Sequence, residues 1–495
     1  MGQRQRIGER INESASRLFC ILLLVSYLVL ATLYAVYTPP WQVPDEPAHY
    51  NYVRTVAEEG RLPVMEPGDY DQVYLERLTA EKFPPDLSIA SLTYEDHQPP
   101  LYYLLAAPVY LLFDGALLPL RLFSVLLGAG VLMTAWGVVR SLCPDRPGVA
   151  LVAVGLIGFL PQHLAMMAGV NNDPLAELMV GTSLWMAVRY VQGRGDGRRY
   201  LLGWGALLGL TVVTKTTAYV ALPVSLLVVG LRAWEEGGQW RGLARRVGWM
   251  VLPMVLIAGP WLVRNAALYG WTDPLGLARH NEVVVGQPRT GEWIARYGWT
   301  GWAVRFLRTT FQSFWGQFGW MGVPFQPAIY AALLLFSGLL AGGFLGWLFD
   351  RRRPALSAGQ RKGAWVLLTS TLLTAALYLF YNRTFVQHQG RYLFPALIPL
   401  ALAAALGLDW LLSGRAVRWA AVACGAVGVA LSAWGVVRGD LPLIPMATAF
   451  GLAGLLGLAA WSPRRRAAVQ VVLLAGLAAL ALYGLFGAIV PTLAR

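Results

Sequence analysis

The stretch that decides the fold is residues 18–37, which read LFCILLLVSYLVLATLYAVY. The run is predominantly apolar and uncharged, and about 20 such residues form an α-helix long enough to cross the hydrocarbon core of a bilayer. Arg4, Arg6, Arg10 and Arg17 precede it, and no small-residue cleavage pattern lies before residues 38–40. The pattern therefore predicts a first transmembrane helix that is retained as a signal anchor.

Similar apolar runs recur through the 495 residues, of which 56% are hydrophobic and 14% charged. Soluble domains carry about 25% charged residues, so a soluble multidomain protein is excluded. We predict an all-α polytopic membrane protein with about thirteen transmembrane helices. The predicted crossings are 18–37, 119–139, 148–168, 174–190, 200–214, 217–233, 247–267, 326–349, 363–381, 391–411, 416–437, 442–461 and 468–490.

The chain has a net charge of +13, and many of its basic residues lie in the short loops between these crossings. When the crossings are threaded with the amino terminus inside, the cytoplasmic segments sum to +16 and the outer segments to −3. Positive charge favours the cytoplasmic side, so the same excess needs no nucleic-acid partner. We expect a multi-pass protein of the plasma (inner) membrane with a cytoplasmic amino terminus and an extracytoplasmic carboxyl terminus. The basic short loops are Arg189–Arg199, Arg241–Arg246, Arg351–Lys362 and Arg464–Arg466.

Two outer loops are long, 38–118 and 268–326. Residues 38–99 hold 12 of the 27 acidic residues of the chain. Leu101–Phe113 is too short to cross a bilayer and is expected to form an interfacial or re-entrant helix. The second loop is rich in tryptophan and phenylalanine, which favours an amphipathic helix near Trp302–Phe318. We divide the chain into a cytoplasmic amino terminus (1–17), a transmembrane catalytic module that includes both loops (18–411), and carboxyl-terminal transmembrane helices (412–495).

Three acidic motifs follow membrane helices on the predicted outer side. The first is Pro44-Asp45-Glu46-Pro47-Ala48-His49, the second Glu95-Asp96-His97, and the third Asn172-Asp173-Pro174-Leu175-Ala176-Glu177. Carboxylates and histidines beside low-dielectric lipid can act as a base or ligate a metal. The alternative at each position is a helix amino terminus, where acidic residues cap free amides and proline suits the first turn.

Basic residues also lie at the outer ends of crossings. Lys215 interrupts an apolar helical pair, Arg264 closes the seventh crossing, and His388 and Arg391 open the tenth. Cations at this level can bind a lipid phosphate or diphosphate. The alternative is that their side chains extend to the membrane headgroups.

The order of these motifs resembles a known superfamily. The chain has an outer-loop Asp-Glu after the first helix, then Pro-Pro-Leu-Tyr-Tyr (99–103), Asn-Asp-Pro-Leu (172–175), Thr-Lys-Thr (214–216) and Gln-Gly-Arg-Tyr-Leu-Phe-Pro (389–395). This resembles the C-superfamily of integral-membrane glycosyltransferases, and a bacterial family of uncharacterised predicted members of it, over nearly the whole chain.

The resemblance implies sugar transfer at the extracytoplasmic face from a polyprenyl-phosphate or polyprenyl-diphosphate donor to a glycan, lipid or protein acceptor. It implies that Asp45, with Glu46 beside it, acts as general base or helps to hold a metal, and that Asp173 contributes. Metal dependence varies within the superfamily, so a divalent metal stays open as a cofactor. The resemblance to oligosaccharyltransferases would place a second acid in an Asp-x-Glu motif, but here Pro174 and Leu175 follow Asp173, which argues against a bound metal. His49, His97, Lys215, Arg264, His388 and Arg391 are the expected substrate-binding residues.

Two other functions remain open from the sequence. A transporter or flippase of lipid-linked glycans also needs acids and cations at membrane level. The charged motifs cluster at one predicted face rather than at the midplane, and no inverted repeat is apparent, which disfavours this class. The second alternative is a non-catalytic membrane scaffold that kept the fold.

Overall fold

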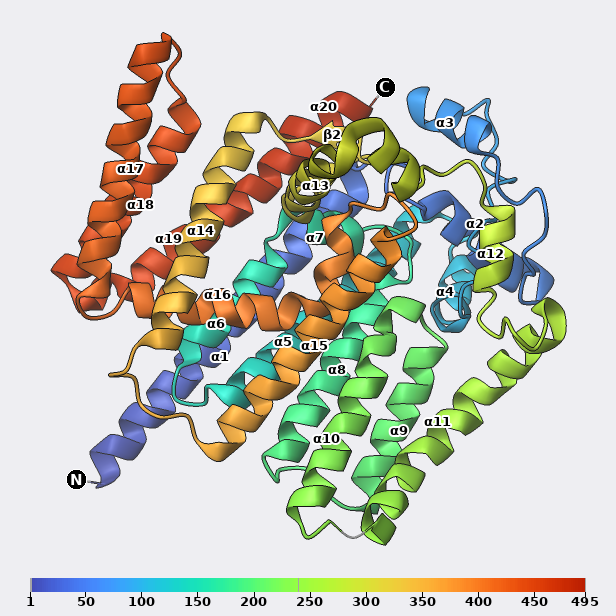
Figure 1. Ribbon diagram of the computed structural model, residues 1–495, viewed down its shortest axis with the longest axis horizontal. Coiled ribbons are helices and arrows are strands. Elements are labelled where there is room, and N and C mark those ends of the chain that lie inside the picture. Colours follow the sequence, from blue (N-terminus) through green and yellow to red (C-terminus); the bar gives the residue numbers. More distant parts are fainter. Residues whose placement is uncertain (1, 239, 495) are drawn as a thin grey trace.

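The computed structural model describes residues 2–238 and 240–494, which are almost entirely helical (Figure 1). This confirms the predicted all-α polytopic architecture. In chain order the elements are α1 (Gly2–Tyr37), α2 (Glu46–Glu59), α3 (Gln72–Ala80), α4 (Leu101–Leu112), α5 (Leu117–Leu142), α6 (Pro147–Gly158), α7 (Pro161–Met167), α8 (Asp173–Val191), α9 (Arg198–Val212), η1 (Thr216–Val220), α10 (Ala221–Glu235), α11 (Trp240–Tyr269), α12 (Leu277–Val283), α13 (Thr290–Trp315), β1 (Gln317–Phe318), β2 (Val323–Pro324), α14 (Pro327–Phe349), α15 (Ala358–Asn382), η2 (Gly390–Ala396), α16 (Leu397–Leu411), α17 (Ala416–Arg438), α18 (Leu443–Trp461), η3 (Pro463–Arg465), α19 (Arg466–Tyr483), η4 (Gly484–Ile489) and α20 (Val490–Leu493).

The number of crossings differs from the predicted thirteen. Within the described ranges, ten helices are long and apolar enough to span a membrane, and all ten match predicted crossings. An eleventh is the pair α6 and α7, which is bent by 64° ahead of Pro161. The two predicted crossings that remain, 174–190 and 200–214, are also helical and correspond to α8 and α9. However, α9 has only 15 residues, and α8 begins with Asp173 and contains Glu177. The count of thirteen is therefore not confirmed, although a helix lies at every predicted position.

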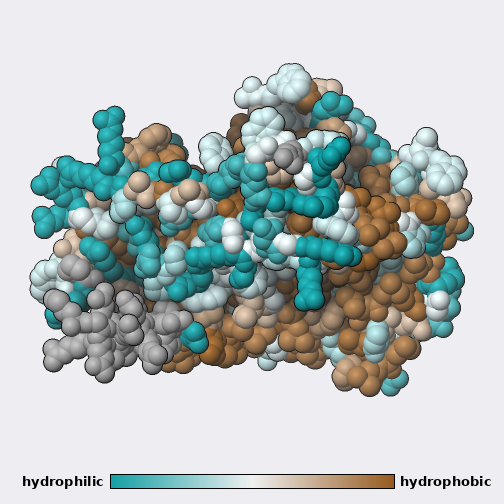
Figure 2. Space-filling view, turned by 90° about the horizontal axis from the view of Figure 1, so that it is seen from below, coloured by the Kyte–Doolittle hydropathy of each residue, from teal (hydrophilic) through white to brown (hydrophobic). Residues whose placement is uncertain are grey.

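The long helices lie side by side in a bundle whose two ends differ (Figure 1). The short helices α2, α3 and α12 and the longer α13 gather at one end, which we call the loop end, and α20 also ends there. The helix α1 begins at the opposite end. Seen from that opposite end, hydrophilic side chains gather across the face of the molecule (Figure 2). The hairpin of α17 and α18 lies at the outer edge of the bundle, where α18 packs on α14.

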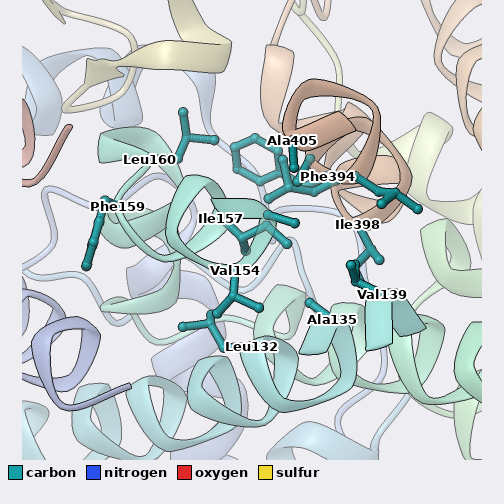
Figure 3. Close-up of a cluster of buried hydrophobic side chains, with 14 of the residues drawn as sticks. Leu132, Ala135, Val139, Val154, Ile157, Phe159, Leu160, Phe394, Ile398 and Ala405 are labelled. Carbon is teal, nitrogen blue, oxygen red and sulfur yellow. The ribbon is translucent and has the colours of Figure 1, made fainter. Parts of the chain in front are cut away.

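The core of the bundle forms where α5, α6 and α16 meet. Leu132 and Val139 of α5 pack toward Ile157 of α6 and Ile398 of α16 (Figure 3). Small residues allow neighbouring helices to approach closely, as is common in membranes. A Cβ atom on Gly407 of α16 would lie 2.4 Å from the carbonyl oxygen of Leu340 on α14. Packing against neighbouring backbone therefore fixes where α14 and α16 cross.

The loop of residues 38–118 is folded against the bundle. It contains α2, α3 and α4, and two clusters of buried aromatic and aliphatic side chains hold these helices together. The segment predicted to be too short to cross forms α4, which has 12 residues. The backbone amide of Leu101 at its start donates to the carbonyl of Val213, 2.8 Å away, just after α9.

The second long loop differs from its predicted form. The helix expected near Trp302–Phe318 begins earlier and ends earlier, as α13, and it is kinked at Gly298, whose φ of 68° suits glycine. A hairpin of β1 and β2 follows it. The second outer loop contacts the first outer loop. The indole nitrogen of Trp320 donates a hydrogen bond to the carbonyl of Trp41 over 3.0 Å. Together the two loops cover the loop end of the bundle.

Candidate active site

Asp45 occupies the position just before α2, but its side chain does not cap that helix. Its backbone is left-handed, with φ 67° and ψ −4°, and no capping hydrogen bond forms. Such a conformation costs a non-glycine residue about 1–3 kcal/mol, and it persists only where surrounding contacts enforce it. One carboxylate oxygen accepts from the Arg391 guanidinium at 2.9 Å, and the other from the Tyr94 hydroxyl at 3.1 Å. The turn therefore aims the carboxylate at Arg391 rather than at its own helix.

Asp173 and Lys215 form a second ion pair at the same end of the bundle. Asp173 is the first residue of α8, where Pro174 follows it. Lys215 has extended backbone in the break between α9 and η1. The ammonium of Lys215 lies 2.6 Å from a carboxylate oxygen of Asp173. Breaking the α9–α10 helical pair at this point thus brings a cation to the start of α8.

The two ion pairs belong to one cluster. Asp173 and Arg391 line the same small cavity, together with Glu177 and Tyr392. The charge of Arg391 acts on Asp173, and that of Lys215 acts on Asp45. Burial is the largest single influence on Asp45 and disfavours its ionised form. The charges of Arg391, His49 and Lys215, together with the hydrogen bond from Arg391, outweigh burial and hold the pKa of Asp45 below its usual value. Both acids are therefore ionised at neutral pH, each beside a cation.

His49 lies one turn into α2 and beside this cluster. Its Nδ1 is 2.8 Å from the hydroxyl of Tyr103, whose ring stacks on Tyr52 with centroids 3.6 Å apart. Burial, reinforced by the charge of Lys215, lowers the pKa of His49 to about 3. The imidazole is therefore neutral at physiological pH, and it can exchange hydrogen bonds but carries no charge.

Glu95 also belongs to this cluster. From the same motif, His97 is predicted from the sequence as a substrate-binding residue, and Glu95 is not. Its Oε2 is buried and has no hydrogen-bond partner. Burial and the nearby charge of Asp45 raise the pKa of Glu95 to about 8. A buried carboxyl group kept neutral at pH 7 is typical of functional sites. The sequence could have identified Glu95 as a candidate, because it is the first residue of the polar motif that precedes Pro99 and Pro100.

Glu46 is adjacent to Asp45 but points into the protein. Arg121 of α5 grips its carboxylate with two hydrogen bonds of 2.6 and 2.8 Å. The same carboxylate accepts from the backbone amides of Trp41 and Val170. Arg121 also donates to the backbone carbonyls of Ala35, Thr38 and Pro39. We therefore assign Glu46 to holding the chain reversal after α1, rather than to catalysis.

The remaining predicted residues have contacts other than the two ion pairs. His97 is buried beside His280, with ring centroids 4.4 Å apart. Arg264 donates to the backbone carbonyls of Leu62 and Pro63, and so secures the first outer loop. The ring of His388 meets three aromatic side chains edge-on, those of Trp293, Trp302 and Phe306.

A metal ion does not fit the side chains at this site. Within residues 2–238 and 240–494, no three His, Cys, Asp or Glu side chains lie close enough together to hold one. The two acids that would supply oxygen ligands, Asp45 and Asp173, are each engaged by a basic side chain instead.

Comparison with known proteins gives one matching family and solved structures of similar fold. Residues 97–263 match the family of dolichyl-phosphate-mannose-protein mannosyltransferases. Two solved structures of ArnT from Cupriavidus metallidurans share the fold at 16% identity. The form bound to undecaprenyl phosphate aligns with a TM-score of 0.55 over 95% of this chain and 77% of ArnT. The apo form aligns with a TM-score of 0.54 over 96% and 78%.

By fold and by this partial family match, the chain resembles the C-superfamily of membrane glycosyltransferases. The oligosaccharyltransferase of Archaeoglobus fulgidus in its apo form also aligns, with a TM-score of 0.46 at 14% identity, over 88% of this chain and 56% of that enzyme. No curated protein matches the sequence. The family match runs from just before α4 into α11, and this part of the chain includes Asp173 and Lys215 but neither Asp45 nor Arg391.

Proposed function

We propose that this glycosyltransferase transfers a sugar from a polyprenyl-phosphate or polyprenyl-diphosphate donor to an acceptor hydroxyl at the extracytoplasmic face. The observation that carries the proposal is the pairing of two acids with two cations at the loop end, Asp45 with Arg391 and Asp173 with Lys215. A base and a phosphate-binding cation are the two groups that this reaction needs. The likeness to ArnT, which was solved with undecaprenyl phosphate, supports the class of donor.

The ion pairs also suggest how donor binding prepares the base. A donor phosphate attracts Arg391 and Lys215, since charged hydrogen bonds to phosphate are strong. As Arg391 turns to the phosphate, Asp45 loses the partner that holds its pKa low. The buried carboxylate then becomes a stronger base only when a donor is present. This exchange limits base activity to the loaded site.

In the transfer step, Asp45 takes the proton from the acceptor hydroxyl. The acceptor oxygen forms a bond to the anomeric carbon of the donor sugar, and the bond from that carbon to the phosphate oxygen breaks. The electron pair of the broken bond leaves on the polyprenyl phosphate. Arg391 and Lys215 stabilise this charge as it develops, which is usually a large contribution to catalysis.

The same arrangement disfavours a transporter. The four charged side chains lie together at the loop end, beside α2 and the start of α8. A transporter places its substrate site near the middle of the membrane between repeated halves. We infer that the loop end faces outward, because the short loops that carry the basic residues, such as those from α8 to α9 and from α14 to α15, lie at the opposite end (Figure 1). This orientation matches the positive-inside rule.

The experiment is a donor-consumption assay on the purified full-length protein in lipid nanodiscs. A panel of undecaprenyl-phosphate and undecaprenyl-diphosphate sugars is incubated with a glycan, lipid and protein extract as acceptor. Mass spectrometry follows the release of undecaprenyl phosphate or diphosphate. Wild-type protein should release it from at least one donor, and Asp45→Asn should not. The control is Asp409→Asn, which removes a carboxylate at the opposite end, near Arg146. If no donor is consumed, or if Asp45→Asn matches wild type, the proposal is wrong.

A further inference from the structure

Three glutamine side chains from two distant segments form a hydrogen-bonded row at the loop end. The side-chain nitrogen of Gln389 donates to the oxygen of Gln387 over 2.8 Å. The nitrogen of Gln387 donates to the oxygen of Gln287 over 3.5 Å. Gln287 in turn hydrogen-bonds the hydroxyl of Tyr70, which donates to Gln72. The row joins both outer loops to the segment before η2.

Both ends of this glutamine row adjoin Asp45. At one end, Gln389 lies two residues before Arg391, which pairs with Asp45. At the other end, the ring of Tyr70 meets Tyr94 edge-on with centroids 5.4 Å apart, and Tyr94 donates its hydroxyl to Asp45. A group bound along the row would therefore lie within reach of the proposed base.

The chemistry of the row suits one kind of ligand. A glutamine amide can donate twice and accept twice, and the bonds within the row use one donor of Gln389 and one donor and one acceptor of Gln387. All three glutamine side chains are partly exposed. Sugar hydroxyls both donate and accept, so they match neutral amides in either direction. Tyr381 and Tyr392, whose ring centroids are 5.9 Å apart, add aromatic surface beside Arg391.

We propose that Gln287, Gln387 and Gln389 bind the acceptor, and that the acceptor is a neutral carbohydrate. This inference rests on the proposed function and names its acceptor class. An acidic acceptor would need a cation free to meet it. Arg391 and Lys215 are paired with Asp45 and Asp173 and are assigned to the donor phosphate. The guanidinium of Arg289, beside the row, lies over the ring of Phe385, 4.3 Å from its centroid. A peptide acceptor would be expected to use a strand edge or side-chain pockets, whereas this row offers side-chain amides.

Binding is tested by saturation-transfer-difference NMR on the full-length protein in nanodiscs without sugar-based detergent. The probes are methyl α-D-mannopyranoside, methyl α-D-galactopyranoside, glucose 6-phosphate and an N-acetylated, amidated Ala-Ser-Ala tripeptide. Wild type should show transfer to at least one methyl glycoside, and Gln387→Ala should weaken that binding about fivefold or more, the effect of losing one neutral hydrogen bond. The matched control is Gln470→Ala, which changes a glutamine at the opposite end, near Gly148.

The row could instead serve only to hold the loops together, and the experiment separates these roles. Melting temperature and undecaprenyl phosphate binding are measured for each variant, and Gln389→Leu provides a second variant if Gln387→Ala fails to fold. Weaker glycoside binding with both other properties unchanged supports the proposal. Transfer to the tripeptide or the sugar phosphate alone, transfer to no probe, or unchanged glycoside binding in the variants overturns it. Asp45→Asn should keep glycoside binding while losing sugar transfer, so failure of the catalytic proposal would be seen separately.

Discussion

At the scale of single residues, two adjacent acids have different surroundings and different expected roles. Asp45 lies beside Arg391 and Tyr94 at the candidate site. Glu46 is completely buried and is held by Arg121 and by two backbone amides. The left-handed backbone at Asp45 separates the two directions. Position in the sequence alone therefore assigns them the same role, whereas their contacts do not.

The first prediction compares these neighbours. Asp45→Asn keeps the size of the side chain and removes its charge, so we expect transfer to be abolished with folding and insertion intact. Glu46→Gln leaves the buried Arg121 without its counter-charge, which typically costs about 3–5 kcal/mol. Its melting temperature should fall well below that of Asp45→Asn. Equal melting temperatures in the two variants would contradict the structural role of Glu46.

The second prediction concerns pH and Glu95. Because the pKa of Glu95 is raised to about 8, the group is neutral below that pH and ionises above it. Ionisation adds a negative charge beside Asp45 and the donor phosphate, so donor affinity should fall as pH rises through about 8. The KM for the donor, measured from pH 6 to 9.5, should rise in wild type. It should stay flat in Glu95→Gln; a rise of equal size there would exclude Glu95 as the titrating group.

At the scale of elements, helix breaks place the charged groups. The chain between α9 and η1 breaks at Lys215, and α8 starts at Asp173. The bend between α6 and α7 brings His163 to Glu177, with its Nε2 3.1 Å from the carboxylate. Straight helices through these positions would have buried the same polar groups against apolar neighbours, at a high cost in free energy. The breaks thus make a polar site at the edge of an apolar bundle.

The third prediction tests the crossing of α14 and α16. Gly407→Ala would place a Cβ 2.4 Å from a backbone oxygen that cannot move freely, so we expect a loss of about 1–3 kcal/mol. Gly451→Ala in α18 is the matched control, because nothing lies within 4 Å of its Cβ position. Thermal melting of the two variants in detergent would measure the difference. A control that melts as early as Gly407→Ala would indicate a general intolerance of the changed helices.

At the scale of the whole molecule, the two ends of the bundle carry different chemistry. The loop end holds the acids and cations of the site under two packed loops, and α20 ends there, whereas α1 begins at the opposite end (Figure 1). Exposed apolar side chains such as Leu256, Leu372 and Val422 lie along the long helices between the ends. This pattern is the one expected of a protein surrounded by lipid on its sides.

The fourth prediction is the orientation of the chain. Reporter fusions after Arg199 and after Arg495 should read cytoplasmic and extracytoplasmic respectively, because the short basic loops sum to positive charge on one side. A fusion within the first outer loop, after Pro67, should read extracytoplasmic and serves as an internal check. A cytoplasmic reading after Arg495 would mean that an odd number of the proposed crossings is wrong.

The sequence by itself determined the membrane class and the helix positions, and it singled out the four residues of the two ion pairs. Apolar length and the positions of charge are local properties of the chain, so residues 18–37 predict a helix without knowledge of any neighbour. The resemblance to the C-superfamily likewise rested only on the order of motifs along the chain, and these motifs contain Asp45, Asp173, Lys215 and Arg391.

Only the tertiary structure decided which of these residues meet. Asp45 and Arg391 are 346 positions apart, and no local pattern states that their side chains pair. Nor could the sequence show that Arg121 engages Glu46, or that Glu95 is buried next to Asp45. The burial of a side chain and its pairing with an opposite charge depend on neighbours that come from helices far apart in the sequence. They set the protonation and direction of each acid, and so they separate the proposed base from a carboxylate that is engaged within the protein.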